Sequence, residues 1–308
     1  MKETFGQKTR RSHKRNQRVV MFWCAFVFAF VIAGVWLFRG TLFQNDSGAS
    51  SSGTNQSRHD ACGTADSRQK STDVTQAPMD HEVCQKLQDL VSQDQRVQQV
   101  IDNCEIYPED ILKMLSRNLD MLNFVLEYPE KVGQVFAETV GEVEGGEVPL
   151  LLQYDQRWGY VDYGNSSVAV SGCGPACLSM VITSLTGDDT ITPYVVAQYA
   201  SEQGYYVPGA GTAWTLMSEG AKHFGVIGEE LPLTKSIMEG VLKEGRPIIC
   251  SMRPGDFTTT GHFIVLTGMK DGKICVHDPN SKKRSEKLWD YETLEGQINN
   301  LWSFTTLF

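Results

Sequence analysis

A run of uncharged residues near the N-terminus constrains this chain more than any other feature of its sequence. Residues 19–38 carry no charged side chain and are rich in Phe, Val and Ala. A helix of this length is about 30 Å long, which matches the hydrocarbon core of a bilayer. The run therefore predicts a transmembrane helix over residues 19–38.

The charges on either side of that run predict its orientation. Seven Lys or Arg residues lie within residues 1–18, whereas only Arg39 follows the run closely. Because positive flanks stay in the cytoplasm, we expect a single-pass protein of the cell membrane, with residues 1–18 as a basic cytoplasmic flank and the remainder at the cell surface. A cleavable signal peptide is the alternative, although its apolar core is usually about 7 to 15 residues long. Both interpretations export the rest of the chain.

The net charge excludes one class of partner. Residues 1–43 carry +7, which leaves −16 on residues 44–308 out of a total of −9. Nucleic-acid binding depends on clustered Lys and Arg, so we expect no nucleic acid partner for this acidic body. With 41% hydrophobic residues, the chain has enough apolar material for a sizeable core, which excludes wholesale disorder.

Composition divides the exported part into segments. Small and polar residues after the apolar run predict a flexible stalk at residues 39–77. Apolar residues at intervals of three and four, interrupted by Pro108 and Pro129, predict a small helical module of three or four short helices at residues 78–140. We interpret this module as a spacer or protein-docking element that packs on the next domain. A glycine-rich acidic joint, residues 141–147, leads into a part rich in strands and turns.

A Gly-Cys-Gly-Pro motif at residues 172–175 directly precedes an apolar stretch that we expect to be helical and to end at Gly187. Pro175 suits the first helical turn, because its missing N–H would be unbonded there in any case. Cys173 is therefore expected at a helix N-terminus, where the dipole and the free backbone N–H groups favour a thiolate. Cys173 is the candidate nucleophile, whereas Cys177 is expected to be buried inside the apolar helix.

A cysteine nucleophile needs a base, and three histidines follow residue 147. His262 comes after a glycine at the start of a predicted strand, where substrate can reach it. We expect His223 to be structural, because it lies in a helix-like stretch. Asp278 follows on the next strand, directly before a proline, and His277 is expected to point to the opposite face.

Strand register decides whether His262 and Asp278 can meet. A two-residue turn at residues 271–272 would put the two side chains on opposite faces of the hairpin. A three-residue loop with a bulge at Gly272 would instead pair residue 269 with residue 273 and make His262 and Asp278 diagonal neighbours on one face. We therefore predict the three-residue loop, with Asp278 accepting the imidazole N–H and stabilising the imidazolium.

Other groups complete the candidate site or stay outside it. Gln153 and Gln156 lie upstream of the cysteine and could each donate to an oxyanion, and their chemistry does not rank them. The remaining cysteines show no metal-ligand spacing, and attack by a cysteine thiolate with a histidine base needs neither a metal nor an organic cofactor, so we expect none.

The order and setting of these residues resemble a known family. Gln153, Cys173 in Gly-Cys-Gly-Pro, His262 in Gly-His-Phe-Ile-Val-Leu-Thr-Gly and Asp278 in His-Asp-Pro are similar to the bacterial papain-like cysteine peptidases of family thirty-nine. The namesakes of this family cut bacteriocin leaders after a double glycine, whereas the similarity here is to its stand-alone, exported peptidase-like branch. It covers about residues 147–308.

The resemblance implies an α+β, papain-like fold in which a helix carrying the cysteine packs on an antiparallel sheet carrying the histidine and the aspartate. It implies a catalytic set of Cys173, His262 and Asp278 with Gln153 as the oxyanion donor, and a peptide or protein substrate. Two alternatives remain open. The same machinery serves cell-wall amidases and acyl transferases, and a surface binding module can keep an inactive site.

Overall fold

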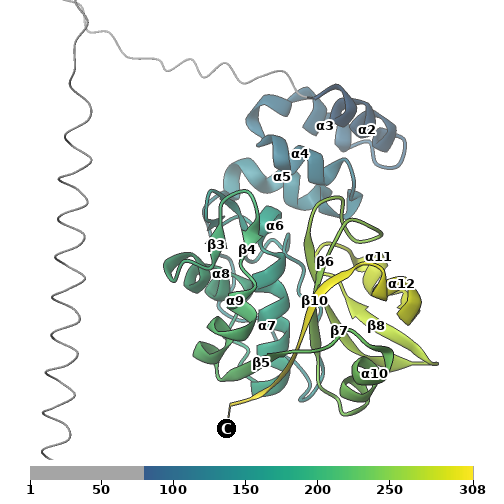
Figure 1. The fold of residues 1–308 in the computed structure, drawn as a ribbon. Helices are drawn as coiled ribbons and strands as arrows, with labels where there is room; N and C mark the ends of the chain where they lie inside the picture. Colours follow the sequence, from purple (N-terminus) through teal and green to yellow (C-terminus); the bar gives the residue numbers. More distant parts are fainter. Residues whose placement is uncertain (1–79, 308) are drawn as a thin grey trace, which may run out of the picture. The chain divides into compact units, whose positions relative to one another are not determined.

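Short apolar stretches between capping residues and prolines form the first helices of the structure, a computed structural model that describes residues 80–307 (Figure 1). Asp80 caps the first helix by accepting the backbone N–H of Glu82 at 2.9 Å, and Pro108 occupies the N-cap position of α4. The helical elements of this part are α2 (His81–Val91), α3 (Val97–Asp102), η1 (Cys104–Ile106), α4 (Glu109–Leu115), η2 (Leu119–Met121) and α5 (Leu122–Lys131). They make up the helical segment, residues 81–131.

The apolar helix after the Gly-Cys-Gly-Pro motif is the central helix of the following part. As predicted, α7 (Cys173–Thr186) begins at the cysteine and ends before Gly187, which adopts a left-handed conformation with a φ of 71°. A C-terminal glycine is favoured there because it has no Cβ to clash. The other elements of this half are β1 (Asp162–Tyr163), β2 (Ser166–Ser167), α6 (Val168–Ser171), α8 (Pro193–Glu202), β3 (Tyr206–Val207), β4 (Gly211–Thr212), α9 (Thr215–Ser218) and η3 (Gly220–Phe224).

An antiparallel sheet of six strands in the order β5-β10-β6-β7-β8-β9 forms the other half of this part (Figure 1). Its elements, with the helices between them, are β5 (Val226–Glu230), α10 (Lys235–Lys243), β6 (Ile248–Met252), β7 (His262–Lys270), β8 (Lys273–His277), α11 (Lys282–Ser285), β9 (Leu288–Trp289), α12 (Tyr291–Glu295) and β10 (Ile298–Thr306). Alternation along β7 divides the core, since Val265 packs with residues of α7 and Ile264 with residues of α10. The structure thus confirms a mixed fold of helices packed on an antiparallel sheet.

The hairpin between β7 and β8 corrects the predicted turn. Asp271 and Gly272 both have positive φ, 52° and 74°, and Lys270 pairs with Lys273, so the connection is a two-residue turn and the predicted three-residue loop is wrong. The extra residue lies inside β7, where a bulge between Leu266 and Gly268 shifts the register by one. Beyond this bulge Val265 pairs with His277, so the register continues with residue 264 opposite residue 278, as predicted at this end of the hairpin.

The helical segment shares a hydrophobic core with the part that follows it. The buried side chains of α2, α4 and α5 form one cluster with Leu152, Tyr154, Tyr160 and Ala169. The ring of Phe124 stacks on that of Tyr160 at a centroid distance of 4.3 Å. Asn118 Nδ2 donates to the carbonyl oxygen of Asn280 at 2.9 Å, which ties the segment to the chain beyond β8.

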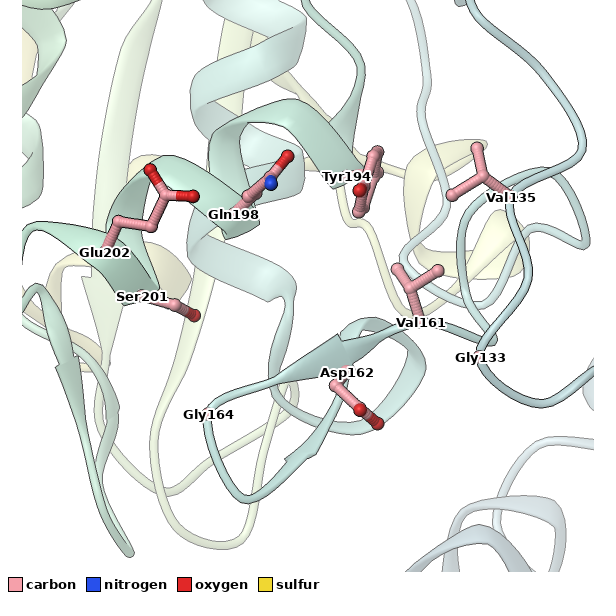
Figure 2. A pocket seen from close by; sticks show the side chains of 9 residues that line it. All are labelled: Gly133, Val135, Val161, Asp162, Gly164, Tyr194, Gln198, Ser201 and Glu202. Atoms are coloured by element: carbon pink, nitrogen blue, oxygen red, sulfur yellow. The ribbon is translucent and has the colours of Figure 1, made fainter.

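A pocket of about 390 Å³ lies between the connector after α5 and helix α8 (Figure 2). Its lining residues are Gly133, Val135, Val161, Asp162, Gly164, Tyr194, Gln198, Ser201 and Glu202. Neither Cys173 nor His262 is among them, so this pocket is distinct from the residues that the sequence singles out.

The predicted flank at residues 1–18, the transmembrane helix at residues 19–38 and the stalk at residues 39–77 lie outside the described residues. Over residues 80–307, none of the helices has both the length and the apolar character needed to cross a membrane. The membrane helix therefore stays a prediction of the sequence.

Candidate active site

Cys173 occupies the first position of α7, and tight packing explains the glycines beside it. The thiol is half-buried, and the preceding N-cap residue offers no side chain to the free N–H groups of the first turn. A Cβ at Gly172 would lie 2.4 Å from the carbonyl oxygen of Val168, and one at Gly174 would lie 2.6 Å from Oγ1 of Thr212. The glycines therefore allow the helix start to pack against α6 and β4, which leaves the thiol at an uncapped helix end.

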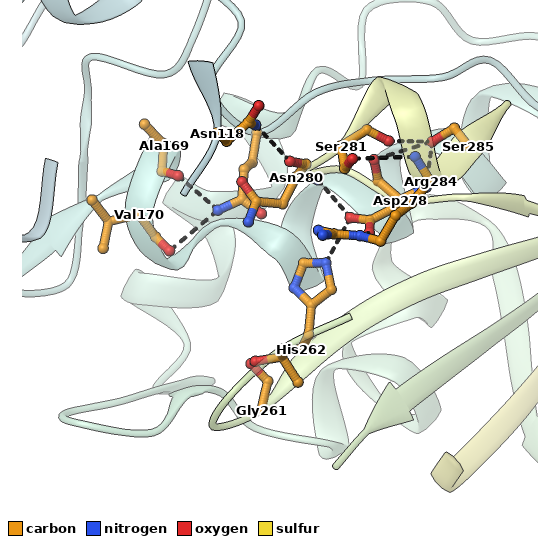
Figure 3. Close-up of polar contacts among 12 residues, drawn as sticks. Asn118, Ala169, Val170, Gly261, His262, Asp278, Asn280, Ser281, Arg284 and Ser285 are labelled. Carbon is orange, nitrogen blue, oxygen red and sulfur yellow. Dashed lines mark hydrogen bonds and ion pairs between the residues drawn. The ribbon is translucent and has the colours of Figure 1, made fainter. Parts of the chain in front are cut away.

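His262, the first residue of β7, contacts Asp278 just beyond the end of β8 (Figure 3). Imidazole Nε2 lies 2.8 Å from carboxylate Oδ1, and the two side chains are 7% and 0% exposed. Burial lowers the pKa of His262, but the charge of Asp278, its hydrogen bond and a hydrogen bond with Cys173 outweigh burial and raise the pKa to about 10. The imidazole thus lies between the thiol and the carboxylate, with Nε2 towards Asp278 and Nδ1 left for Cys173.

Arg284 is a member of this cluster that the sequence analysis missed. Its Nε donates to Oδ2 of Asp278 at 2.5 Å, while the backbone N–H of Asn280 donates to Oδ1 at 2.8 Å. Burial raises the pKa of Asp278, but the charges and hydrogen bonds of His262 and Arg284 outweigh it and hold the pKa below its usual value. No periodicity in the sequence indicates this contact, because it depends on the chain turning back after Pro279.

Gln153 is buried near this cluster, but its amide faces α6. Its backbone N–H donates to the carbonyl oxygen of Pro279 at 2.8 Å. Its side-chain Nε2 donates to the carbonyl oxygens of Ala169 and Val170 at 2.6 and 3.2 Å, which uses both amide hydrogens. Oε1 has no hydrogen-bond partner. In this conformation Gln153 has no free N–H for an oxyanion.

The second candidate glutamine lies in a different environment. Gln156 Nε2 donates to Oε2 of Glu127 at 2.7 Å and to the carbonyl oxygen of Asn123 at 3.3 Å, both on α5. Its side chain therefore connects the helical segment to the following part. The structure thus separates two glutamines that residue chemistry alone left unranked.

The other histidines and the buried cysteines are outside this arrangement. His223 stacks on the ring of Tyr199 at a centroid distance of 4.2 Å. His277 is half-buried, and burial lowers its pKa. Cys177 and Cys250 are fully buried, and burial raises the pKa of each thiol. Cys177 is therefore in the core, as the sequence predicted.

Between residues 80 and 307, no cluster of three or more His, Cys, Asp or Glu side chains is arranged to hold a metal ion. The site contains a half-buried thiol beside a buried imidazole, and this imidazole lies within hydrogen-bond distance of a buried carboxylate. This arrangement suits nucleophilic chemistry in which the imidazole exchanges a proton with the thiol and the carboxylate stabilises the imidazolium.

The comparison with protein families agrees with the sequence resemblance. The profile of the Peptidase_C39 like family matches residues 146–306, just over half of the chain. A crystal structure of the peptidase domain of Streptococcus ComA, a bifunctional ABC transporter involved in quorum sensing, is 18% identical, with a TM-score of 0.35, 44% of this chain covered and 92% of that chain. A crystal structure of a C39-like peptidase from Bacillus anthracis is 15% identical, with a TM-score of 0.30 and coverages of 51% and 94%. No curated protein matches the sequence.

Proposed function

This chain belongs to the Peptidase_C39 like family, and on that premise we propose that it is a papain-like cysteine peptidase whose catalytic residues are Cys173, His262 and Asp278. The observation that carries the proposal is the position of the buried His262 imidazole, which bonds Asp278 at 2.8 Å on one side and meets Cys173 on the other. An imidazolium stabilised by a carboxylate supports a thiolate beside it at neutral pH.

The reaction follows from these positions. The Cys173 thiolate attacks the peptide carbonyl carbon, a C–S bond forms, and the carbonyl oxygen becomes an oxyanion. When the intermediate collapses, the C–N bond breaks and the His262 imidazolium gives its proton to the leaving amine. His262 then takes a proton from water, which attacks the thioester and releases the acid and the thiolate. Throughout, Asp278 keeps the imidazole oriented and stabilises its charged form.

Stabilisation of the oxyanion comes from the helix start and from Gln153. The first-turn N–H groups of α7 point towards the thiol end of the helix, where they favour negative charge. Gln153 contributes after its amide exchanges the bonds to Ala169 and Val170 for one to the oxyanion. The unbonded Oε1 of Gln153 lowers the cost of that change, because rotation breaks no bond at this atom.

The proposal includes the localisation and membrane topology of the protein. Residues 19–38 anchor the chain in the membrane, and the catalytic domain, residues 147–308, lies outside the cell beyond the stalk and the helical module. A C-terminal epitope tag degraded by protease added to intact cells, together with recovery of the protein in the membrane fraction, is the expected result. A tag protected until the cells are lysed contradicts this topology.

Thiol labelling tests the catalytic proposal without a known substrate. Iodoacetamide at neutral pH is expected to alkylate Cys173 faster than Cys84, Cys104 and Cys275, which are half-buried thiols outside the site and serve as internal controls. His262→Gln should reduce the Cys173 rate to that of the controls. Equal rates for all four thiols in the folded wild-type protein would contradict the proposal.

Substrate assays then separate peptidase from related chemistry. Purified protein that comprises residues 44–308 is incubated with a peptide library and with peptidoglycan. The Cys173→Ala variant is the matched control. Cleavage of peptides by the wild type alone is the expected result. Release of wall fragments without peptide cleavage would show that the protein is a cell-wall amidase and not a peptidase.

A further inference from the structure

Both oxygens of the buried Asp278 carboxylate are bound, and the second is bound by a positive charge. Oδ1 accepts hydrogen bonds from His262 and from the backbone of Asn280. Oδ2 accepts from Nε of Arg284, whose side chain is 28% exposed while that of Asp278 is 0% exposed. The Arg284 guanidinium therefore reaches inward from the surface helix α11 to the carboxylate behind His262 (Figure 3).

We propose that Arg284 is a positioning residue that orients Asp278 towards His262 and neutralises the buried site, an inference that rests on the peptidase function proposed above. A carboxylate can turn about its terminal bond and present either oxygen. The contact with Arg284 assigns Oδ2 to the guanidinium and thereby leaves Oδ1 for the imidazole.

Hydrogen bonds hold the backbone of Arg284 at both its N–H and its carbonyl group. The Oγ of Ser281 accepts the backbone N–H of Arg284 at 3.2 Å, and the carbonyl oxygen of Arg284 accepts Nε1 of Trp289 at 3.1 Å. The same short helix binds Asp278 a second time, since the backbone N–H of Asp278 donates to Oγ of Ser285 at 2.9 Å. The side chain and backbone of Asp278 and the guanidinium of Arg284 thus belong to one hydrogen-bonded segment, residues 278–285.

The charges of the site balance only when Arg284 is counted. A Cys173 thiolate, a His262 imidazolium, an Asp278 carboxylate and an Arg284 guanidinium sum to zero, whereas removal of Arg284 leaves one buried negative charge in excess. The other titratable groups that face Asp278 are Cys177 on α7 and Tyr154, which burial keeps neutral, raising the pKa of Tyr154 to about 12. Asp120 of η2 acts on Tyr154 and adds a negative charge at longer range.

A pH profile of alkylation measures this role. The rate of iodoacetamide addition to Cys173 is followed by mass spectrometry of the mapped peptide, in the wild type and in Arg284→Gln. Loss of the positive charge favours protonation of both the Cys173 thiolate and the Asp278 carboxylate. The acid midpoint, which is the pH at which the rate has fallen to half on the acid side of the profile, should therefore rise by about one pH unit. Arg284→Lys keeps the charge and should keep the midpoint close to that of the wild type.

Lys283→Gln is the matched control, because it removes the same charge from the same helix at an exposed side chain. Its midpoint should equal that of the wild type. An unchanged midpoint in Arg284→Gln, or an equal shift in Lys283→Gln, overturns the proposal. If the wild-type Cys173 shows no enhanced rate at any pH, the peptidase function itself fails, which is a different result.

A double variant guards against misfolding of Arg284→Gln. Asp278→Asn with Arg284→Gln removes both charges of the pair, so neither is left without its partner. If Arg284 acts through Asp278, this double variant should have nearly the same midpoint as Asp278→Asn alone. The opposite result is that the midpoints of the double variant and of Asp278→Asn differ as much as those of Arg284→Gln and the wild type. That result would show that Arg284 acts as a distant charge, and it overturns the positioning role.

Discussion

Nε2 of His262 lies 2.8 Å from Oδ1 of Asp278, and the bulge between Leu266 and Gly268 sets the register that brings them together. The two-residue turn of this hairpin would by itself place the pair on opposite faces. One extra residue, Thr267, reverses that outcome. The contact therefore depends on the strand that carries the histidine as much as on the two residues themselves.

Deletion of Thr267 is expected to keep His262 beside Asp278. The deletion removes the bulge together with its extra residue, so Leu266 still pairs with Val276 and residue 264 stays opposite residue 278. Insertion of one alanine between Val276 and His277 instead puts Asp278 opposite residue 263, on the other face from His262. The alkylation rate of Cys173 should stay close to that of the wild type in the deletion variant and fall to that of Cys84 in the insertion variant. Fast labelling in the insertion variant would show that the register does not set the contact.

Asp278→Asn should lower the pKa of His262. Burial lowers that pKa, whereas the carboxylate charge, its hydrogen bond and the contact with Cys173 together raise it to about 10, and an amide keeps the shape of the carboxylate without its charge. NMR titration of the imidazole in a Cys173→Ala background should show a pKa at least about one unit lower. Asp290→Asn, an exposed carboxylate paired with Lys273, is the control and should leave the titration unchanged. An unaltered pKa in Asp278→Asn contradicts the assignment.

The same pair predicts how stability depends on pH. The folded pKa of His262 is raised from an unfolded value of about 6.5 to about 10. Its contribution is therefore fully present below about pH 6.5 and is lost as pH rises towards 10. The difference in Tm between the wild type and His262→Gln should shrink over this range. A difference that grows with pH would reverse the sign and exclude a stabilised imidazolium.

Gln153→Ala should separate acyl transfer from simple alkylation. Alkylation by iodoacetamide forms no oxyanion, so its rate at Cys173 should stay close to that of the wild type. Peptide cleavage should fall by about 10²- to 10³-fold in kcat, as expected for loss of one oxyanion donor. Gln156→Ala, whose amide binds Glu127, should affect neither. Equal losses in both assays would show that Gln153 acts only by binding Ala169 and Val170.

The shared core predicts that the helical segment and the catalytic part unfold together. Leu115 of α4 is fully buried in that core. Leu115→Ala should lower the free energy of unfolding by about 2 to 5 kcal/mol. In a protein of residues 80–308, all tryptophans lie beyond residue 147, so their fluorescence reports only the catalytic part. Leu115→Ala should still lower the urea midpoint that they report, whereas Arg117→Ala, on the exposed surface, should not. Loss of helix without a change in tryptophan fluorescence would show two independent units.

Local signals account for what the sequence predicted well. Pro175 and Gly187 mark the start and the end of α7, and a glycine before an apolar run marks the strand that begins at His262. These residues act within a few positions of themselves, so one sequence suffices to interpret them.

The missed features depend on contacts between distant parts of the chain. Thr267 looks like any other strand residue, and its place in a bulge follows from how β7 pairs with two neighbours at once. Arg284 belongs to a basic run that resembles a solvated surface. The orientation of the Gln153 amide depends on carbonyl groups sixteen and seventeen residues away.

The position of the helical segment has a consequence for engineering. Cys173 comes from the helical half of the catalytic part and His262 from the sheet half, so their alignment requires the two halves to stay in place. The helical segment touches both, through Phe124 on Tyr160 before α6 and through Asn118 on Asn280 after β8. It therefore connects the half that carries Cys173 with the half that carries His262. A catalytic part cut out at residue 146, where the family match begins, would lose this connection.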